Sequence, residues 1–177
     1  MVAAGYTYEA AMAFMLDRTS GVVCAAVPYE RCEQLDLPQM VADNSGLHST
    51  AFTVSVDLKE GGTTGIPVEE RARTIQALAG TSARPDDFAR PGRIFPVRAA
   101  RGGVLEREDH TEAGVDLSRL AGLSGVTAMC EIVAADWRMA RYPDLQELSE
   151  REGLALISVG DLVAYRKAQS AAGSLNG

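Results

Sequence analysis

The sequence lacks most features that would assign it to a functional class at once. Its three cysteines show no CxxC spacing, which argues against a disulfide scaffold and against a structural zinc site. No apolar run approaches the roughly 20 residues of a membrane span, and the N-terminus shows no signal peptide. Walker, GxGxxG, HExxH and GxSxG motifs are all absent. These absences favour a reduced, cytoplasmic protein whose chemistry must be sought in single side chains.

Lysine is scarce, and its two residues are Lys59 and Lys167. The net charge of −7 argues against nucleic-acid binding, although a few converging arginines can still bind an anionic substrate. A length of 177 residues with 46% hydrophobic and 23% charged residues is typical of one globular domain. We predict a single domain over residues 1–169 and a disordered polar tail over residues 170–177.

Hydrophobic periodicity predicts a mixed architecture. Apolar runs and alternation predict the strands, and helical spacing with capping residues predicts the helices. Strands are expected at 21–27, 51–57, 94–98, 126–133 and 154–158, and the one at 51–57 should carry a polar face of Thr53, Ser55 and Asp57. Helices are expected at 8–18, 28–33, 68–78, 111–120, 143–152 and 162–169, with Thr111 as a cap and with Ser158 and Asp161 opening the last one. Residues 81–92 are expected to form a loop. Pro96 favours an edge position for the strand at 94–98, because proline cannot donate to a ladder. The order of elements predicts an α+β or α/β sandwich, a mixed sheet flanked by helices.

The segment from 98 to 131 holds the strongest candidates for chemistry. Arg107, His110 and Thr111 lie at an expected loop-to-helix junction, where a guanidinium and free amides could hold an anion. A surface arginine and an exposed histidine are the alternatives. Glu131 stands in an apolar run between Met129 and Val133, so we expect it to be buried and either functional or paired with an arginine.

Other candidates are weaker. Cys24 lies inside an apolar strand and is more typical of a core residue than of a nucleophile. His48 lies in a polar loop and could belong to the surface or to a site. The glycine-rich turn at 61–65, which contains Thr64, resembles a phosphate cradle only loosely.

Several segments match one enzyme family in order along the chain. They include T-T-G-I at 63–66, P-G-R-I-F-P at 91–96, G-G-V-L-E-R at 102–107, H-T-E-A at 110–113 and C-E-I at 130–132. With these segments the chain resembles the 3,4-dihydroxy-2-butanone 4-phosphate synthase family of riboflavin biosynthesis, over nearly all of residues 3–167.

The resemblance implies a lyase that converts D-ribulose 5-phosphate to 3,4-dihydroxy-2-butanone 4-phosphate and formate. It also implies Mg²⁺ as cofactor, with Mn²⁺ as a possible substitute, and a homodimer with active sites at the interface. The residues to which it assigns roles are the catalytic Glu131, Arg93 and Cys24, the substrate-binding Arg107, Asp109, Thr111, Thr64 and His48, and the metal ligand His110.

The chain also departs from the family pattern. The family's N-terminal acidic segment, which supplies a second metal ligand, has no counterpart in this sequence, and loss of the strand before it would uncover a sheet edge. Arg93 replaces a histidine, and an arginine cannot shuttle protons near neutral pH. Asp109 replaces a glycine and could either supply a metal ligand or repel the substrate phosphate.

Three hypotheses follow from these departures. The first is an active synthase whose metal shell is rebuilt from Asp109 or by another chain. The second is a lyase or isomerase acting on another sugar phosphate, and the third is a non-catalytic partner that keeps the fold. We predict a synthase-like lyase, because Arg107, His110, Thr111 and Glu131 are all retained.

Overall fold

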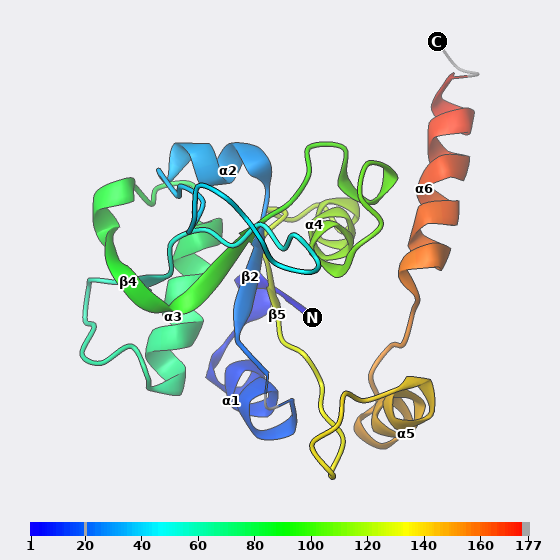
Figure 1. The fold of residues 1–177 in the computed structure, drawn as a ribbon, viewed down its shortest axis with the longest axis horizontal. Helices are drawn as coiled ribbons and strands as arrows, with labels where there is room; N and C mark the ends of the chain where they lie inside the picture. The colour runs from blue at the N-terminus through cyan, green and yellow to red at the C-terminus, as the bar shows by residue number, and fades with distance from the viewer. Residues whose placement is uncertain (20, 175–177) are drawn as a thin grey trace.

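The computed structural model describes residues 1–19 and 21–174 and is organised around a five-stranded mixed sheet (Figure 1). The strand order is β1-β5-β2-β4-β3. The strands are β1 (Val2–Ala3), β2 (Cys24–Val27), β3 (Val56–Leu58), β4 (Phe88–Arg98) and β5 (Thr127–Met129). Strand β2 pairs in parallel with β4 and antiparallel with β5, which confirms the predicted mixed sheet. The sheet edge at β5 is covered by the two-residue strand β1.

Helices cover both faces of the sheet, because the residues of β2 alternate between two cores. Ala25 and Val27 belong to the larger core, which includes Met12 of α1 (Glu9–Arg18) and Ile75 of α3 (Val68–Ala79). Ala26 points to the opposite face and packs with Val115 of α4 (His110–Leu120). The side chain of every β2 residue is buried, as expected for a central strand.

The remaining helices lie around this body. They are α2 (Tyr29–Gln34), α5 (Tyr142–Glu152), α6 (Val159–Ser174) and the 3₁₀ turns η1 (Ala4–Tyr6), η2 (Pro85–Asp87) and η3 (Gly103–Leu105). Helix α6 packs through Leu162 and Val163 onto Val104 and Ala113. Helix α5 has no buried residue and stands apart from the sheet in Figure 1. None of the described helices combines the length and apolarity needed to cross a membrane.

Strand β4 corrects one prediction, because it lies inside the sheet between β2 and β3 rather than at an edge. Pro96 has no amide hydrogen to donate. It is tolerated there because the neighbouring segment around Phe52 pairs with β4 through an isolated bridge, Phe52 with Val97, and not through a continuous ladder. The carbonyl of Pro96 still accepts the Thr53 amide at 2.9 Å. Strand β4 also begins at Phe88, within residues 81–92, for which a loop was predicted.

The segment 51–57 differs from its prediction in the same region. Only Val56–Leu58 forms strand β3. The expected polar face is buried, since the Thr53 hydroxyl donates to the Pro96 carbonyl at 3.2 Å and the Ser55 hydroxyl accepts the Gly92 amide at 3.1 Å. The hydroxyl groups of Thr53 and Ser55 are therefore satisfied by hydrogen bonds inside the protein and do not face solvent.

The C-terminal part holds two further corrections. Residues 154–158 form no strand, and strand β5 ends at Met129 instead of residue 133. The Ser158 hydroxyl accepts the Asp161 amide at 3.1 Å, so this serine opens the last helix as predicted. That helix continues through Ser174, where a disordered tail was predicted, and residues 175–177 lie outside the described part of the chain.

Candidate active site

Arg107 is held by three acceptors just before α4. Its Nη1 lies 3.0 Å from Glu112 Oε2, and its Nη2 lies 3.0 Å from Asp109 Oδ2. Nη2 also donates to the His48 carbonyl at 3.2 Å, which brings the 39–50 loop to this point. The side chain keeps 32% of its surface exposed, so the guanidinium is oriented and still accessible to a ligand. We refer to Arg107, Glu112, Asp109 and His48 as the Arg107 cluster.

Glu112 is the member of this cluster that the sequence analysis missed. Its side chain is only 1% exposed, and its second oxygen, Oε1, accepts the Ala100 amide at 2.8 Å. A buried carboxylate is stable only when it is paired and hydrogen-bonded, and both conditions are met. Glu112 therefore fixes Arg107 to the loop that follows β4. The signal in the sequence for a buried role of Glu112 was a charged residue among the apolar positions of α4.

The N-terminus of α4 is capped by Asp109, not by Thr111 as predicted. The Asp109 carboxylate accepts the Thr111 amide at 3.4 Å, so this amide is not free for an anion. Thr111 itself is buried. His110 points outward with 79% of its side chain exposed, and its Nδ1 lies 3.9 Å from Asp109 Oδ1. Asp109 thus contacts Arg107 and the helix end and lies next to the imidazole.

These residues do not form a complete metal site. Within residues 1–19 and 21–174, no group of three or more histidine, cysteine, aspartate or glutamate side chains is placed to hold a metal ion. Mg²⁺ requires near-octahedral coordination by oxygen, whereas His110 offers nitrogen and Asp109 is already paired with Arg107. These residues therefore do not by themselves complete a coordination shell for Mg²⁺.

Glu131 is exposed, which corrects the expectation of a buried acid. Its Oε2 accepts the Val22 amide at 3.0 Å, and it makes no ion pair in the described part of the chain. Gly21 makes this placement possible, because a Cβ at that position would lie 2.5 Å from Oε2 and 2.8 Å from the Glu131 backbone. No hydrogen bond to Oε1 is found in the described part of the chain.

Cys24 lies close to Glu131 at the start of β2. Its side chain is 3% exposed, and it pairs in register with Phe95 and Met129. Burial, followed by the negative charges of Glu131 and Cys130, raises the pKa of Cys24 to about 12. Cys24 is therefore a neutral thiol at physiological pH and not an activated nucleophile.

Arg93 and Thr64 lie away from the Arg107 cluster, and no hydrogen bond or ion pair in the described residues joins them to it. The Arg93 amide donates to Asp57 Oδ1 at 2.8 Å, and its guanidinium lies 3.4 Å from Oδ2. The Thr64 hydroxyl accepts the Ile66 amide at 3.4 Å.

The glycine-rich turn that contains Thr64 already holds an anion of its own. Glu70 accepts the amides of Thr63 and Gly65 at 2.9 and 2.8 Å. Hydrogen bonds from the Thr63 hydroxyl, then from these amides, lower the pKa of Glu70. The carboxylate of Glu70 therefore occupies the place that a phosphate would take in a cradle.

A pocket of about 280 Å³ opens beside the Arg107 cluster. Its wall is formed by Tyr29, Ser49, Ala51, Arg98, Ala99, Ala100, Arg101, Glu106, Arg107 and Glu112. Three of these residues are arginines, although the chain as a whole is acidic. Positively charged side chains therefore gather in the wall of this pocket.

Comparison with known proteins identifies the family. The family model described as 3,4-dihydroxy-2-butanone 4-phosphate synthase matches residues 1–165. The enzyme of that name from Agrobacterium fabrum is 50% identical over 158 residues, which cover 89% of this chain and 74% of the relative. A monofunctional chloroplastic riboflavin biosynthesis protein of Arabidopsis thaliana is 48% identical over 94% of this chain, but the match spans only 36% of that longer protein.

A solved structure agrees with these relatives. It is a 3,4-dihydroxy-2-butanone 4-phosphate synthase in complex with two magnesium ions, and it superposes with a TM-score of 0.90 at 40% identity. The match covers 95% of this chain and 83% of that one. It confirms the α+β fold predicted from the sequence. Family model, relatives and solved structure agree, and the chain belongs to the 3,4-dihydroxy-2-butanone 4-phosphate synthase family.

Proposed function

We propose that this chain is a lyase that converts D-ribulose 5-phosphate to 3,4-dihydroxy-2-butanone 4-phosphate and formate. The observation that carries the proposal is Arg107, oriented by the buried Glu112 at the wall of a pocket. A planar guanidinium held in one orientation can bind a phosphate through two parallel hydrogen bonds. The matched family supplies the reaction.

Arg107 binds the substrate phosphate in this proposal. Before substrate arrives, Asp109 and the His48 carbonyl occupy its Nη2. A phosphate dianion competes with Asp109 for that nitrogen, whereas Glu112 remains on Nη1 as the fixed support. Thr111, Thr64 and His48 stay predicted substrate contacts.

Glu131 carries the proton transfers. Its exposed carboxylate has one oxygen fixed by the Val22 amide and one without a hydrogen bond from the described residues, which suits a general base in a substrate-covered site. Cys24 contributes a neutral wall beside it. Arg93 cannot take the role of the family histidine as a proton carrier, so we assign it a binding role.

Magnesium is the proposed cofactor, with Mn²⁺ as a second possibility, because a solved relative contains two magnesium ions. His110 is the expected protein ligand. The further oxygen ligands must come from substrate or from groups outside the residues described.

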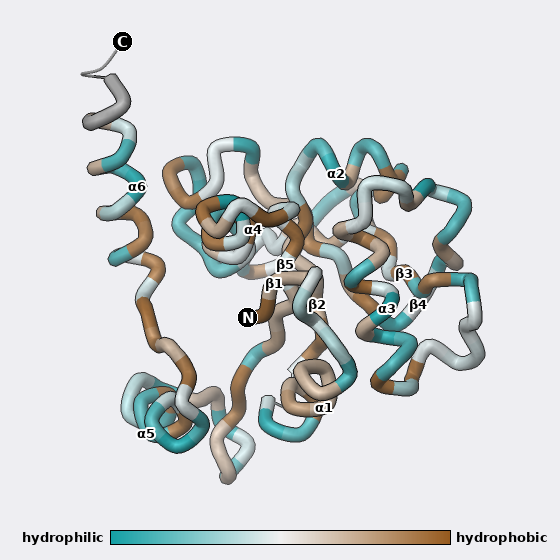
Figure 2. The backbone as a smooth tube through the Cα atoms, turned by 180° about the vertical axis from the view of Figure 1, so that it is seen from behind, coloured by the Kyte–Doolittle hydropathy of each residue, from teal (hydrophilic) through white to brown (hydrophobic). Residues whose placement is uncertain are grey.

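A homodimer is part of the proposal. Helix α5 has no buried residue, and Met139, Tyr142, Leu154 and Ile157 around it are exposed. Figure 2 shows the hydrophobic connection that leads from α5 to α6. A second copy of the chain would cover this surface. The cytoplasmic location stays a prediction from composition.

The decisive experiment measures formate and the four-carbon phosphate released from D-ribulose 5-phosphate with Mg²⁺, beside an EDTA control. We expect both products in equal amounts, with loss of activity in EDTA. Folded protein that releases no formate would contradict the proposal. Turnover of D-xylulose 5-phosphate alone would instead favour another sugar phosphate, an alternative that the synthase relatives do not support.

A further inference from the structure

Arg98, the last residue of β4, brings a cation into the pocket wall without a carboxylate to balance it. When the Gln39 amide is oriented with its oxygen toward Arg98, that oxygen lies 3.3 Å from Nε and 3.2 Å from Nη2. The guanidinium carbon lies 4.7 Å from the centre of the Tyr29 ring. Both partners are neutral, and no acidic group of the described residues lies within 4.0 Å of Arg98. A half-buried cation of this kind is stabilised by an anion.

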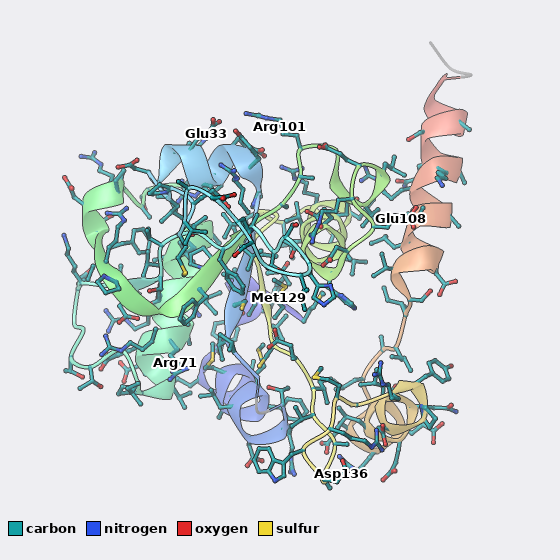
Figure 3. The ribbon with its side chains drawn as sticks, viewed as in Figure 1. Glu33, Arg71, Arg101, Glu108, Met129 and Asp136 are labelled. Carbon is teal, nitrogen blue, oxygen red and sulfur yellow. The ribbon has the colours of Figure 1, made fainter. Side chains whose placement is uncertain are left out.

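A second guanidinium lies against the same aromatic ring. The carbon of the Arg101 guanidinium is 3.7 Å from the Tyr29 ring centre. Its only acidic partner in the described residues is Glu33 of α2, 3.2 Å away, and Figure 3 shows the two side chains next to one another. Both are more than half exposed, so this pair is weak. Tyr29 therefore makes cation–π contacts with both guanidinium groups.

The carboxylates in the pocket wall are committed elsewhere. Glu112 is bound to Arg107 and the Ala100 amide. Glu106 accepts the Gly102 amide at 2.7 Å. Arg107 is already matched by two carboxylates, whereas Arg98 has none. Within the described residues, the positive charge of the pocket that lacks a carboxylate partner thus lies on Arg98, next to the weakly paired Arg101.

We propose that Arg98 and Arg101, placed by Tyr29, form a second oxyanion-binding position in this pocket, separate from Arg107. Its ligand is a small oxyanion, either a phosphate or a carboxylate. The small residues Ala51, Ala99 and Ala100 in the wall leave room for such a group. The proposal goes beyond the proposed function, because it holds whether or not the chain releases formate.

The test titrates inorganic phosphate calorimetrically into the full chain, in buffer free of other oxyanions. The variants are Arg98→Gln, Arg107→Gln and, as a control, Arg151→Gln on α5, which makes only surface pairs. We expect Arg98→Gln to weaken one binding event at least about tenfold, as loss of a charged hydrogen-bond donor does. That event should survive Arg107→Gln and the control within about threefold.

Two further variants keep the result interpretable. Arg101 is exposed, so Arg101→Gln should weaken the same event without loss of folding even if Arg98→Gln unfolds. Glu33→Gln removes the competing carboxylate and should tighten binding. Competition by formate in Arg107→Gln would assign the position to carboxylates as well, and its absence would assign it to phosphate. Phosphate binding that disappears in Arg107→Gln and is unchanged in Arg98→Gln and Arg101→Gln would overturn the proposal.

Discussion

The Arg107 cluster and Glu131 are built very differently, although both belong to one proposed site. Arg107 is bound by two carboxylates and a carbonyl, and its main support, Glu112, is almost fully buried. Glu131 is exposed, and within the described residues its side chain accepts one hydrogen bond, from the Val22 amide. The proposed phosphate-binding end is thus held in place by several groups of one chain, whereas the proposed proton-transfer end is held by one hydrogen bond of the described residues. Substitutions at the two ends should therefore have separate effects on binding, chemistry and stability.

The largest effect is expected from Glu131→Gln. Glutamine keeps an acceptor for the Val22 amide but cannot take a proton, so turnover should fall by about 10²–10⁴-fold. Because the side chain is exposed, the free energy of unfolding should change by less than about 0.5 kcal/mol. Rates of formate release and urea denaturation measure the two quantities. A large loss of stability would show that Glu131 is structural.

Glu112→Ala should cost about 3 kcal/mol of unfolding free energy. It removes the almost fully buried carboxylate that Arg107 Nη1 and the Ala100 amide share as acceptor, while Asp109 and the His48 carbonyl remain on Arg107 Nη2. The matched control is Glu108→Ala. Glu108 is exposed, lies next to Arg107 on the loop before α4 (Figure 3) and makes no hydrogen bond or ion pair in the described residues. Equal denaturation midpoints for both variants would contradict the account of the proposed phosphate-binding end.

Gly21→Ala should damage both stability and turnover, by about 1–3 kcal/mol in stability. The added Cβ would lie 2.5 Å from Glu131 Oε2 and 2.8 Å from its backbone. Comparison with Glu131→Gln separates displacement of the carboxylate from loss of its charge. Gly5→Ala, where a Cβ meets nothing within 4 Å, is the control. A fully active Gly21→Ala protein would show that the position of Glu131 is unimportant.

The smallest effect concerns Cys24. Its pKa is raised in the folded state to about 12, so its contribution to stability is complete below the ordinary value of 9.0 and is lost as the pH rises toward 12. The fall in unfolding free energy between pH 8 and pH 10 should be about 1.4 kcal/mol larger in the wild type than in Cys24→Ala. Identical falls would mean that Cys24 titrates normally.

Local sequence patterns predicted the parts of the fold that depend on local chemistry. The continuous apolar run at 21–27 identified a buried strand, and Ser158 with Asp161 identified a helix start. The rule that places proline at sheet edges failed for Pro96, which lies on an inner strand. The position is tolerated because its missing amide hydrogen faces an irregularly paired segment, and only the order of the strands shows this. Sheet order is set by contacts between distant segments, which periodicity does not contain.

The site residues, like the fold, could be predicted only where the groups that interact are neighbours in the sequence. Arg107, His110 and Thr111 could be grouped from the sequence because they are neighbours at one helix end. The burial of Glu112 follows from a bond to Ala100, twelve residues away, and the His48 carbonyl reaches Arg107 across 59 residues. The exposure of Glu131 was not predictable either, since its apolar neighbours indicated a longer strand than β5.

The central claim is that binding and proton transfer are carried by separate parts of the site. The most direct test is the steady-state kinetics of formate release by Arg107→Gln and Glu131→Gln, measured side by side with D-ribulose 5-phosphate. The account predicts that Arg107→Gln raises KM by about 10- to 100-fold with a smaller change in kcat, whereas Glu131→Gln lowers kcat with KM nearly unchanged. If both variants lowered kcat equally and left KM unchanged, the division between the two ends of the site would be wrong.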